Sequence, residues 1–513
     1  MGAGVAGIYL TVKLASMGYR VILLESGGEG LGTDELNTVV NVEGCHKWGR
    51  DGRARGLGGS SLIWGRRMIP MTRSDLMARD HIGAPAWPIS YDDLLAGLSS
   101  VESFFGLGNG SYDNDTSALA PNEGSVVRAF ESCFIVRRPK WAEYRGGNAW
   151  RIAKMKLARF RDIEVWTGAT VLGAELDADK ERIAAISARS NTGRRLSVQA
   201  EYFILAAGGI ETTRLLLQIH AESGGRVFEG CDALGRYFHD HLDLCVHRFG
   251  HEETRAINLA LTPAYEGRHR RSLQFEMSAA LQASERVASM FFHVTADTTA
   301  NPTLETLREV KRLVERRQVT VGAATLLRQR IDARLAGRIL FERFLQKRLY
   351  FPQDTSFRLR ICAEQSPRYD NRLLLSRETD RMGMRKVGIV WRPGPEDERT
   401  LRIGVDKFEK YWNMSSYRIL ADISALTRKI GEDEPLIAKA QDYAHPSGGT
   451  RMGIRPTDSV VDADLVCHKV PNLGVVSSST FPSSGSANPT LTIALLADYA
   501  ARMLPKRIGA PAR

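Results

Sequence analysis

The sequence predicts an α/β protein in which a Rossmann-like domain is joined to a second domain centred on an antiparallel sheet. Three observations support this fold class. The length of 513 residues exceeds one hydrophobic core and indicates two or three domains. A glycine turn at residues 2–7 is followed by a helical segment and a buried strand, the order typical of a dinucleotide-binding unit. Several strand-like runs lie in 240–300 and 355–395.

The composition is that of a globular protein. Hydrophobic residues make up 43% and charged residues 25%, which excludes disordered, collagenous and disulfide-scaffold chains. No apolar run approaches 18 residues, so we expect no transmembrane helix. The six cysteines are scattered and form no CxxC pair, which argues against a zinc ribbon or a redox dithiol. This usage favours a reducing compartment, and we expect a cytoplasmic protein.

The positive charge is concentrated in one segment. The net charge is +11, and residues 308–348 hold twelve Lys and Arg against four acids. The rest of the chain is nearly neutral, so we expect no nucleic-acid partner. Leucine and phenylalanine recur at helical spacing across 303–349, which predicts two helices separated by 319–324. The simplest interpretation is a solvated face packed on the second domain; the alternative is contact with a membrane surface or a protein partner.

The glycine turn stands at the very start of the sequence. Such a turn normally follows a buried strand, and no signal-peptide pattern precedes it here. We expect that the gene start lies upstream and that added codons would improve folding or cofactor content. The alternative is a protein that lacks its first strand.

Local patterns predict the elements along the chain. Ser90 and Asp93 form a capping-box pattern for a helix over 90–106. Asn191 to Gly193 is a hairpin signal inside a small sheet spanning 163–207. The other expected elements are a helix at 7–18, a strand at 19–25, a loop at 26–52, a helix at 151–161, a buried strand at 203–209 that enters a second glycine turn, and a final helix at 489–504.

The glycine turn GAGVAG (2–7) has the GxGxxG spacing. Its glycines permit a tight turn and close approach of a pyrophosphate, which then faces the positive end of the following helix. Glu25 ends the next strand, eighteen residues after Gly7, and can accept hydrogen bonds from ribose hydroxyls. The motif with its helix, strand and acid predicts a dinucleotide site, with FAD and NAD both open at this point.

A second glycine segment, RGLGGSSLIWG (55–65), distinguishes between these cofactors. Adjacent glycines and hydroxyls suit a backbone lying against phosphate or an isoalloxazine edge. Here the chain resembles the glucose-methanol-choline (GMC) family of flavin oxidoreductases. The resemblance continues in order to the end of the chain, through WPISYDDL (87–94), LAAGGIETTRLLL (205–217), EQSPRYDNRLLLS (364–376), HPSGGTRMG (445–453) and 472–501, and is loose over 246–355. The C-terminal text is most similar to the bacterial sugar and polyol branch.

The resemblance implies an FAD-dependent enzyme that oxidises CH–OH to a carbonyl by hydride transfer to flavin N5. The FAD-binding domain would be assembled from 1–90, 150–245 and 436–513, with a connecting or lid segment at 91–149. A substrate-binding domain would span 246–435, including the basic helical insertion 303–349. The implied FAD contacts are Gly2, Gly4, Gly7, Glu25, Gly58, Gly59, Ser60, Ser61, Val171, Ala207, Gly208 and Pro489.

Alcohol oxidation needs a group that removes the O–H proton and a second group that holds the developing alkoxide. His445 and Asn488 occupy the family's His and His/Asn positions, so we assign His445 as the base and Asn488 as the donor to the substrate oxygen. The Asn-Pro turn would also direct the helix at 489–504 toward the flavin. Some members link flavin to a histidine after the double glycine. Residues 61–64 contain none, so FAD is expected to be non-covalent.

The substrate remains open at this level. A sugar, polyol or glycoside is favoured by the branch resemblance. A hydrophobic alcohol such as a sterol is the alternative, because His-Pro-x-Gly-Gly also occurs in sterol oxidases. Nicotinamide-dependent transfer and a non-catalytic remnant of a flavoprotein are further readings. The electron acceptor, whether oxygen, a quinone or a cytochrome, is not specified by the sequence.

Two polar groups need a separate interpretation. The run HDHLDLCVH (239–247) places metal-ligand types on one strand face, but the resemblance favours a structural or substrate-side role, so no metal is expected. Gln274, Glu276 and His293 lie in strand-like text. They could face the substrate, but exposed sheet positions are the simpler expectation.

Overall fold

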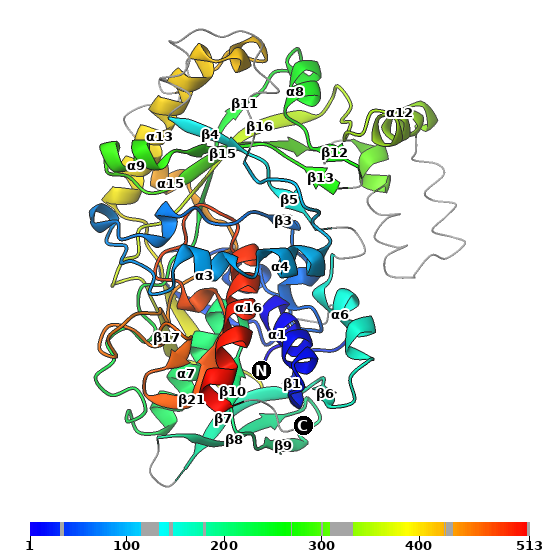
Figure 1. Cartoon of the computed structure of the whole chain (residues 1–513). Coiled ribbons are helices and arrows are strands. Elements are labelled where there is room, and N and C mark those ends of the chain that lie inside the picture. Colours follow the sequence, from blue (N-terminus) through cyan, green and yellow to red (C-terminus); the bar gives the residue numbers. More distant parts are fainter. Residues whose placement is uncertain are drawn as a thin grey trace.

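The computed structural model describes residues 1–30, 35–113, 133–142, 147–177, 181–267, 269–298, 301–307, 332–424, 426 and 434–509. Figure 1 shows two halves: a lower one that contains both marked termini, and an upper one built on a larger sheet. The α/β class with an antiparallel second sheet is confirmed. The predicted domain boundaries stay a prediction.

The lower half contains short parallel strand pairs from distant parts of the chain. β1 (Val21–Leu24) pairs with β6 (Ile163–Trp166), and β10 (Phe203–Leu205) pairs with β21 (Val470–Val475), which also pairs with β20 (Val466–Cys467). The first two residues lie between the pairs: the Met1 amino group donates to Ile204 O at 2.8 Å, and Gly2 N donates to Leu24 O at 2.8 Å. Backbone hydrogen bonds therefore connect both pairs into one Rossmann-like layer.

Helices cover this layer. α1 (Val5–Ser16) packs against α16 (Pro489–Ile508), and the Tyr9 hydroxyl donates to Asp498 Oδ1 at 2.8 Å across the contact. The nearly all-buried face of α1 follows from its small and aliphatic residues. The other helices of this half are α3 (Tyr91–Leu95), α4 (Leu98–Phe105), α6 (Ala149–Leu157) and α7 (Gly208–Glu222). A small antiparallel sheet lies below: β7 (Thr170–Leu176), β8 (Ile183–Arg189) and β9 (Arg195–Val198).

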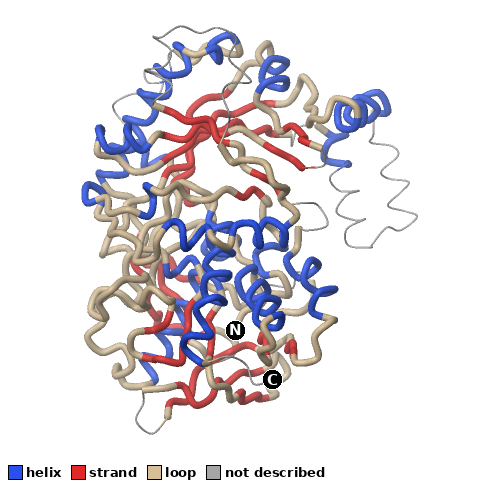
Figure 2. Tube along the Cα trace, in the orientation of Figure 1, coloured by secondary structure: helices blue, strands red, loops and turns tan. Residues whose placement is uncertain are grey.

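The upper half is built on a six-stranded sheet, which Figure 2 shows with helices above it. Its strand order is β19 (Gln441–Asp442), β11 (Leu242–Arg248), β16 (Ser356–Ala363), β15 (Met290–Asp297), β14 (Gln274–Met277), β4 (Phe134–Arg137). The long helix α13 (Pro395–Met414) packs on it through aromatic contacts. Phe408 stacks on Phe292 with ring centroids 3.9 Å apart.

Two smaller sheets contain the other strands of the described residues. One contains β12 (Ala264–Glu266), β13 (His269–Arg271), β5 (Lys140–Trp141) and β3 (Arg67–Met68); the other contains β17 (Arg372–Thr379), β18 (Arg385–Val390) and β2 (Val39–Glu43). The described part of the chain also contains the α-helices α2 (Trp48–Asp51), α8 (Thr254–Ala260), α9 (Ala279–Glu285), α12 (Ala333–Phe344) and α15 (Leu436–Lys439).

Several local expectations are confirmed and two are wrong. The turn at 191–193 joins β8 to β9, and Ser90 caps α3 by accepting from Asp93 N at 3.1 Å. The expected single helix over 90–106 is broken into α3 and α4 at Ala96 and Gly97. The expected loop at 26–52 contains β2 and α2, because β2 pairs with β18 far along the chain. Local sequence does not carry that pairing.

Most of the basic stretch, residues 308–331, lies outside the described residues. Its C-terminal part forms α12. Among the described helices, none has the length and apolar character needed to span a membrane.

Candidate active site

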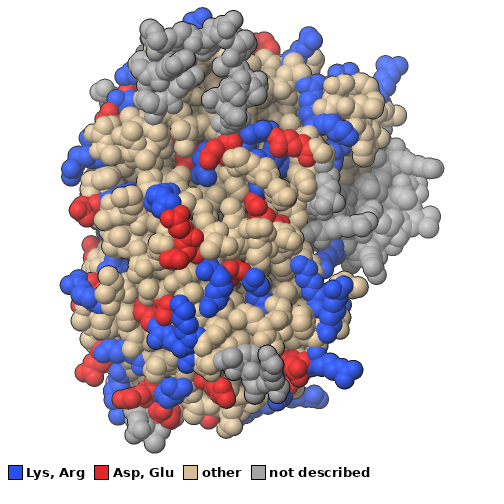
Figure 3. Space-filling model, in the orientation of Figure 1, with Lys and Arg blue, Asp and Glu red and all other residues tan. Residues whose placement is uncertain are grey.

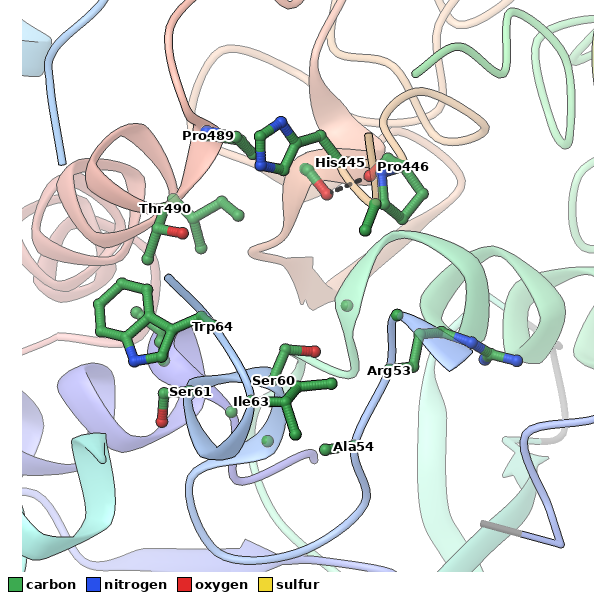
Figure 4. Close-up of a pocket in the computed structure, with 18 of the residues that line it drawn as sticks. Arg53, Ala54, Ser60, Ser61, Ile63, Trp64, His445, Pro446, Pro489 and Thr490 are labelled. Carbon is green, nitrogen blue, oxygen red and sulfur yellow. Dashed lines mark hydrogen bonds between the residues drawn. The ribbon is translucent and has the colours of Figure 1, made fainter. Parts of the chain in front are cut away.

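A cavity of about 990 Å³ lies between the Rossmann-like layer and the upper sheet. Figure 4 shows His445 and Pro489 on one side of it and Ser60 and Ile63 on the other. Twelve of the fourteen predicted site residues line this cavity: Gly2, Gly4, Glu25, Gly59, Ser60, Ser61, Val171, Ala207, Gly208, His445, Asn488 and Pro489. The fold therefore brings together residues from three distant parts of the chain.

The other two residues, Gly7 and Gly58, are not among the lining residues, and both serve the turns themselves. A Cβ on Gly7 would lie 1.9 Å from Gly2 O, so only glycine permits this helix entry. Gly58 has φ +117° and donates its N–H to Ala3 O at 2.9 Å, which ties the two glycine segments together.

The cavity end of α1 fits a dinucleotide phosphate. Gly4 is the N-cap, no side chain caps the helix, and the first turn contains no acid. A Cβ on Gly4 would meet its nearest neighbour only at 3.9 Å, and one on Gly208 would meet nothing within 4 Å. The backbone is thus open toward the cavity, and the free N–H groups and the helix dipole favour an anion there.

Glu25 shapes the turn as well as lining the cavity. Its carboxylate accepts hydrogen bonds from Ala3 N at 2.8 Å, from Gly27 N at 2.8 Å and from Gly56 N at 3.0 Å. These bonds hold both glycine segments against the end of β1. The sequence predicted a ribose contact for Glu25, which stays a prediction beside this role.

The two serines of the second glycine segment differ. Ser61 is buried; its hydroxyl donates to Gly58 O at 2.5 Å and accepts from Ala149 N at 3.0 Å. It therefore positions the turn and α6. Ser60 is exposed and lines the cavity, where its hydroxyl is available to a ligand.

His445 is paired with a second histidine. His445 Nδ1 lies 2.8 Å from His241 Nδ1, and His241 Nε2 lies 2.8 Å from the carbonyl oxygen of Gly485. A carbonyl only accepts, so His241 Nε2 carries the hydrogen, and in the neutral ring Nδ1 is then an acceptor. His445 must donate from Nδ1, which leaves its Nε2 unprotonated. Among the described residues Nε2 of His445 has no hydrogen-bond partner, and His445 lines the cavity.

The register of two strands produces this pair. β11 and β19 are antiparallel, with Leu242 opposite Asp442, and an isolated bridge joins His239 to Ser447. Between these two points, the strand that carries His445 contains two residues more than its partner. Ala444, with φ +57°, lies in the intervening bulge. The bulge places His445 opposite His241, about two hundred residues away in the chain.

Asp240 holds the backbone next to this pair. Its carboxylate accepts from His445 N at 2.9 Å and from His241 N at 2.7 Å, and it lies 3.1 Å from His46 Nε2. Burial opposes the charge, but the hydrogen bond from His46 and the neighbouring histidines keep the pKa of Asp240 below its usual value.

His445 is neutral at physiological pH. Burial, with smaller contributions from His241 and the charge of Arg67, lowers the pKa of His445 to about 3, against the opposing charge of Asp240. Burial also lowers the pKa of His241. Both rings are therefore in the neutral form that the hydrogen-bond chain requires, and His445 can accept a proton at Nε2.

Asn488 is the N-cap of α16, with Pro489 in the first helical position. Its side-chain Oδ1 is buried and has no hydrogen-bond partner within the described ranges. An orphaned buried acceptor in a cavity wall fits a group that completes its hydrogen bonds with a ligand hydroxyl. The amide, the end of α16 and His445 therefore face one space.

Three polar residues of the upper sheet differ from expectation. Gln274, Glu276 and His293 are 0%, 1% and 6% exposed, so the prediction of exposed sheet positions is wrong. The strand-like sequence indicated the strands but not the neighbouring elements that bury these side chains. His293 lines the cavity.

The histidines of 239–247 have separate partners. His239 Nδ1 lies 2.8 Å from Tyr237 O, and Asp243 is ion-paired with Arg360. Within the described residues, the side chains of metal-ligand type that converge are His46, Asp240 and Asp442. Both carboxylates already accept backbone N–H groups, as Asp442 does from Lys47 N at 2.7 Å. We interpret this cluster as a hydrogen-bonded support for the loop that carries His445.

Comparisons with known proteins find similarity to oxidoreductases. A family model described as GMC oxidoreductase matches residues 367–497. Over 99% of its length the chain is 23% identical to 2-methyl-1,2-propanediol dehydrogenase from Mycolicibacterium austroafricanum, of which it covers 95%. Over 34% of its length it is 29% identical to 6'''-hydroxyparomomycin C oxidase from Streptomyces lividus. The match spans 30% of that relative's length.

Among solved structures, the chain is similar to an FAD-dependent oxidoreductase from Chaetomium thermophilum. The TM-score is 0.60 at 15% identity, over 99% of each chain. This likeness shows the fold.

Proposed function

We propose, from the premise that this chain belongs to the GMC oxidoreductase family, that it uses FAD to oxidise a CH–OH group of a polar alcohol to a carbonyl. The observation that carries the proposal is the His445–His241–Gly485 chain, which leaves a neutral base with a free Nε2 in a cavity beside a dinucleotide turn. The same arrangement favours an enzyme over a non-catalytic remnant.

His445 takes the hydroxyl proton at Nε2. As the proton arrives, the ring becomes a cation whose Nδ1–H remains bonded to His241, and the nearby carboxylate of Asp240 stabilises the charge. The Asn488 amide orients the substrate oxygen, and the α16 end directs its positive dipole into the same space. FAD, when bound, supplies the acceptor for the two electrons that leave the carbon.

The FAD is bound without a covalent link. The segment 60–65 offers no histidine, and the lining residues of the cavity include no cysteine. Of the two lining histidines, His445 is engaged with His241, and His293 Nδ1 contacts Arg67 at 3.2 Å.

The substrate is a sugar, glycoside or polyol. By their names, the relatives reported above act on 2-methyl-1,2-propanediol, which is a diol, and on 6'''-hydroxyparomomycin C, which is a hydroxy compound. Arg67, Arg270 and His293 line the upper end of the cavity, and such donors favour a polar substrate over a sterol-like alcohol.

Two further features favour a particular cellular location of the protein. All six cysteines are free thiols, which supports the cytoplasm. On α12 and just after it, Leu340, Phe341, Phe344 and Leu345 are 43–68% exposed, and Arg338 and Arg343 flank them. Figure 3 shows Lys and Arg gathered in this upper right region. An apolar helix face with basic neighbours fits peripheral contact with an anionic membrane surface.

The decisive experiment is the His445→Ala variant. Loss of a general base should slow flavin reduction by an alcohol roughly 10²–10⁴-fold while flavin stays bound. The measurement is anaerobic stopped-flow absorbance with a panel of polyols. Reduction at the wild-type rate would remove His445 from the mechanism.

A further inference from the structure

The upper end of the cavity contains a guanidinium group that has no carboxylate partner among the described residues. Arg67, in β3, lines the cavity. Its Nη2 donates to Gln274 Oε1 at 2.5 Å, and its Nη1 donates to His293 Nδ1 at 3.2 Å. Both partners are neutral acceptors, and the described residues provide no ion pair to Arg67. Burial lowers the pKa of Arg67, which reflects the cost of holding this charge away from water.

The neighbouring acids are committed to other cations. Glu276, which accepts from Gln274 at 2.9 Å, is paired with Arg137 at 3.0 Å. Asp243, another lining carboxylate, is paired with Arg360. The polar network around Arg67 therefore connects to acids whose charge is already offset, and its own positive charge remains.

Two N–H groups next to the cavity also have no hydrogen-bond acceptor among the described residues. Arg67 Nε and His293 Nε2 are buried without a hydrogen-bond partner in the described part of the chain. Since His293 Nδ1 accepts from Arg67, its Nε2 carries the hydrogen, and burial together with Arg67 holds the pKa of His293 well below 6.5. The pair thus presents surplus N–H groups and no acceptor, which suits a ligand with acceptor oxygens.

A second guanidinium adds to the same potential. Arg270 lines the cavity, stacks on Trp141 with its Cζ 3.6 Å from the ring centroid, and has a buried Nε without a partner among the described residues. Burial lowers the pKa of Arg270 to about 10, and the charges of Arg66 and Arg67 act in the same direction. Arg270 therefore stays protonated at neutral pH and adds positive charge at this end.

We propose that Arg67 and His293, with Arg270, form a subsite for an anionic group of the substrate, so that the alcohol oxidised here also carries a carboxylate or a phosphate ester. This rests on the proposed function for the identity of the reacting group, but the binding preference can be measured separately. Sugar acids and sugar phosphates are the substrate classes that combine the two features. The guanidinium fork matches the oxygens of either anion.

Three six-carbon probes that differ at one end test this subsite: sorbitol, gluconate and sorbitol 6-phosphate. Isothermal titration calorimetry on the purified protein at low salt should give at least about tenfold tighter binding of one anion than of sorbitol, because a hydrogen bond to a charged group is worth about ten- to hundredfold. The tighter of the two anions identifies the group. Equal affinity for all three probes, or no detectable binding of any, overturns the proposal.

Variants at Arg67 test whether this side chain produces the preference for anions. Arg67→Met should reduce the anion preference to within about threefold, and Arg67→Lys should keep part of it by retaining the charge. Arg20→Met, at an exposed arginine paired with Glu164, is the matched control and should keep the full preference. Retained preference in Arg67→Met overturns the proposal. The wild-type comparison needs no variant, so poor folding of one does not remove the test.

The proposed function and the anionic subsite can be refuted independently. If neutral polyols reduce the flavin and the anions bind no better, the proposed function stands and the anionic subsite is wrong. If the anions bind preferentially but no flavin is present, the subsite stands and the oxidoreductase assignment is wrong.

Discussion

The hydrogen bond between His241 and His445 provides a sharp test of the proton-transfer argument. In His241→Leu the acceptor for His445 Nδ1–H is lost, and neutral His445 is free to place its hydrogen on Nε2, where it is no longer a base. In His241→Asn a side-chain oxygen can accept from His445, and the amide can donate to Gly485 O as His241 does at 2.8 Å. The two variants therefore separate the hydrogen bond from the ring.

The expected loss of rate follows from the hydrogen bond between His241 and His445. A 2.8 Å bond between buried groups is worth about 1–3 kcal/mol when one partner is left unsatisfied. At about 1.4 kcal/mol per tenfold, flavin reduction should slow about 5- to 150-fold in His241→Leu. His241→Asn should recover most of this loss.

The assay is anaerobic stopped-flow reduction at saturating alcohol across pH 4–9. Because both rings are neutral, the loss of His241 acts on His445 through the hydrogen bond, and the rate should fall across the whole pH range in His241→Leu. A purely structural loss would not be recovered by His241→Asn. His81→Leu, at a histidine bonded to Val287 O at 3.1 Å, is the control for removing a ring. A wild-type rate and profile in His241→Leu would refute the reasoning.

Three further predictions follow from the same structure. Acid precipitation should release FAD intact into the supernatant; flavin absorbance retained by the pellet would contradict non-covalent binding. The free energy of unfolding should fall as the pH drops from 7 to 5, because burial keeps His239, His241, His293 and His445 neutral in the fold while the unfolded chain takes up their protons below about 6.5. Each such histidine adds up to about 1.4 kcal/mol per pH unit, and a urea midpoint that is the same at both pH values would exclude this linkage. Flotation with anionic vesicles at low salt should recover the protein, and Phe344→Glu in α12 should abolish this; absence of wild-type binding would dismiss the membrane contact.

The dinucleotide half of the site could be predicted from the sequence because its determinants are local. The GxGxxG spacing, the following helix and Glu25 lie within twenty-five residues, and each is read from neighbours in the chain. His445 and Asn488 were found by resemblance, and both line the same cavity. The expectation that FAD is non-covalent rests on residues 60–65, which contain no histidine, and it stays a prediction.

The parts that sequence missed depend on pairing over long distances. His241 meets His445 because β11 lies beside β19 and Ala444 forms a bulge, and neither register nor bulge is encoded nearby. Arg67 was not singled out at all, since an isolated Arg-Arg pair has no spacing signal. A search of the sequence for Lys or Arg in strands without a nearby acid could have identified Arg67.

The base and the anion subsite are electrostatically connected. The charge of Arg67 contributes to lowering the pKa of His445, so the two groups share one potential. A bound carboxylate would offset Arg67 and remove part of that contribution, which raises the pKa of His445 from its low value toward the range where an imidazole accepts a proton readily. The same anion that binds at the upper end would thus strengthen the base at the other. Oxidation of an anionic alcohol should gain in proton transfer as well as in binding, while a neutral polyol would meet the weaker base.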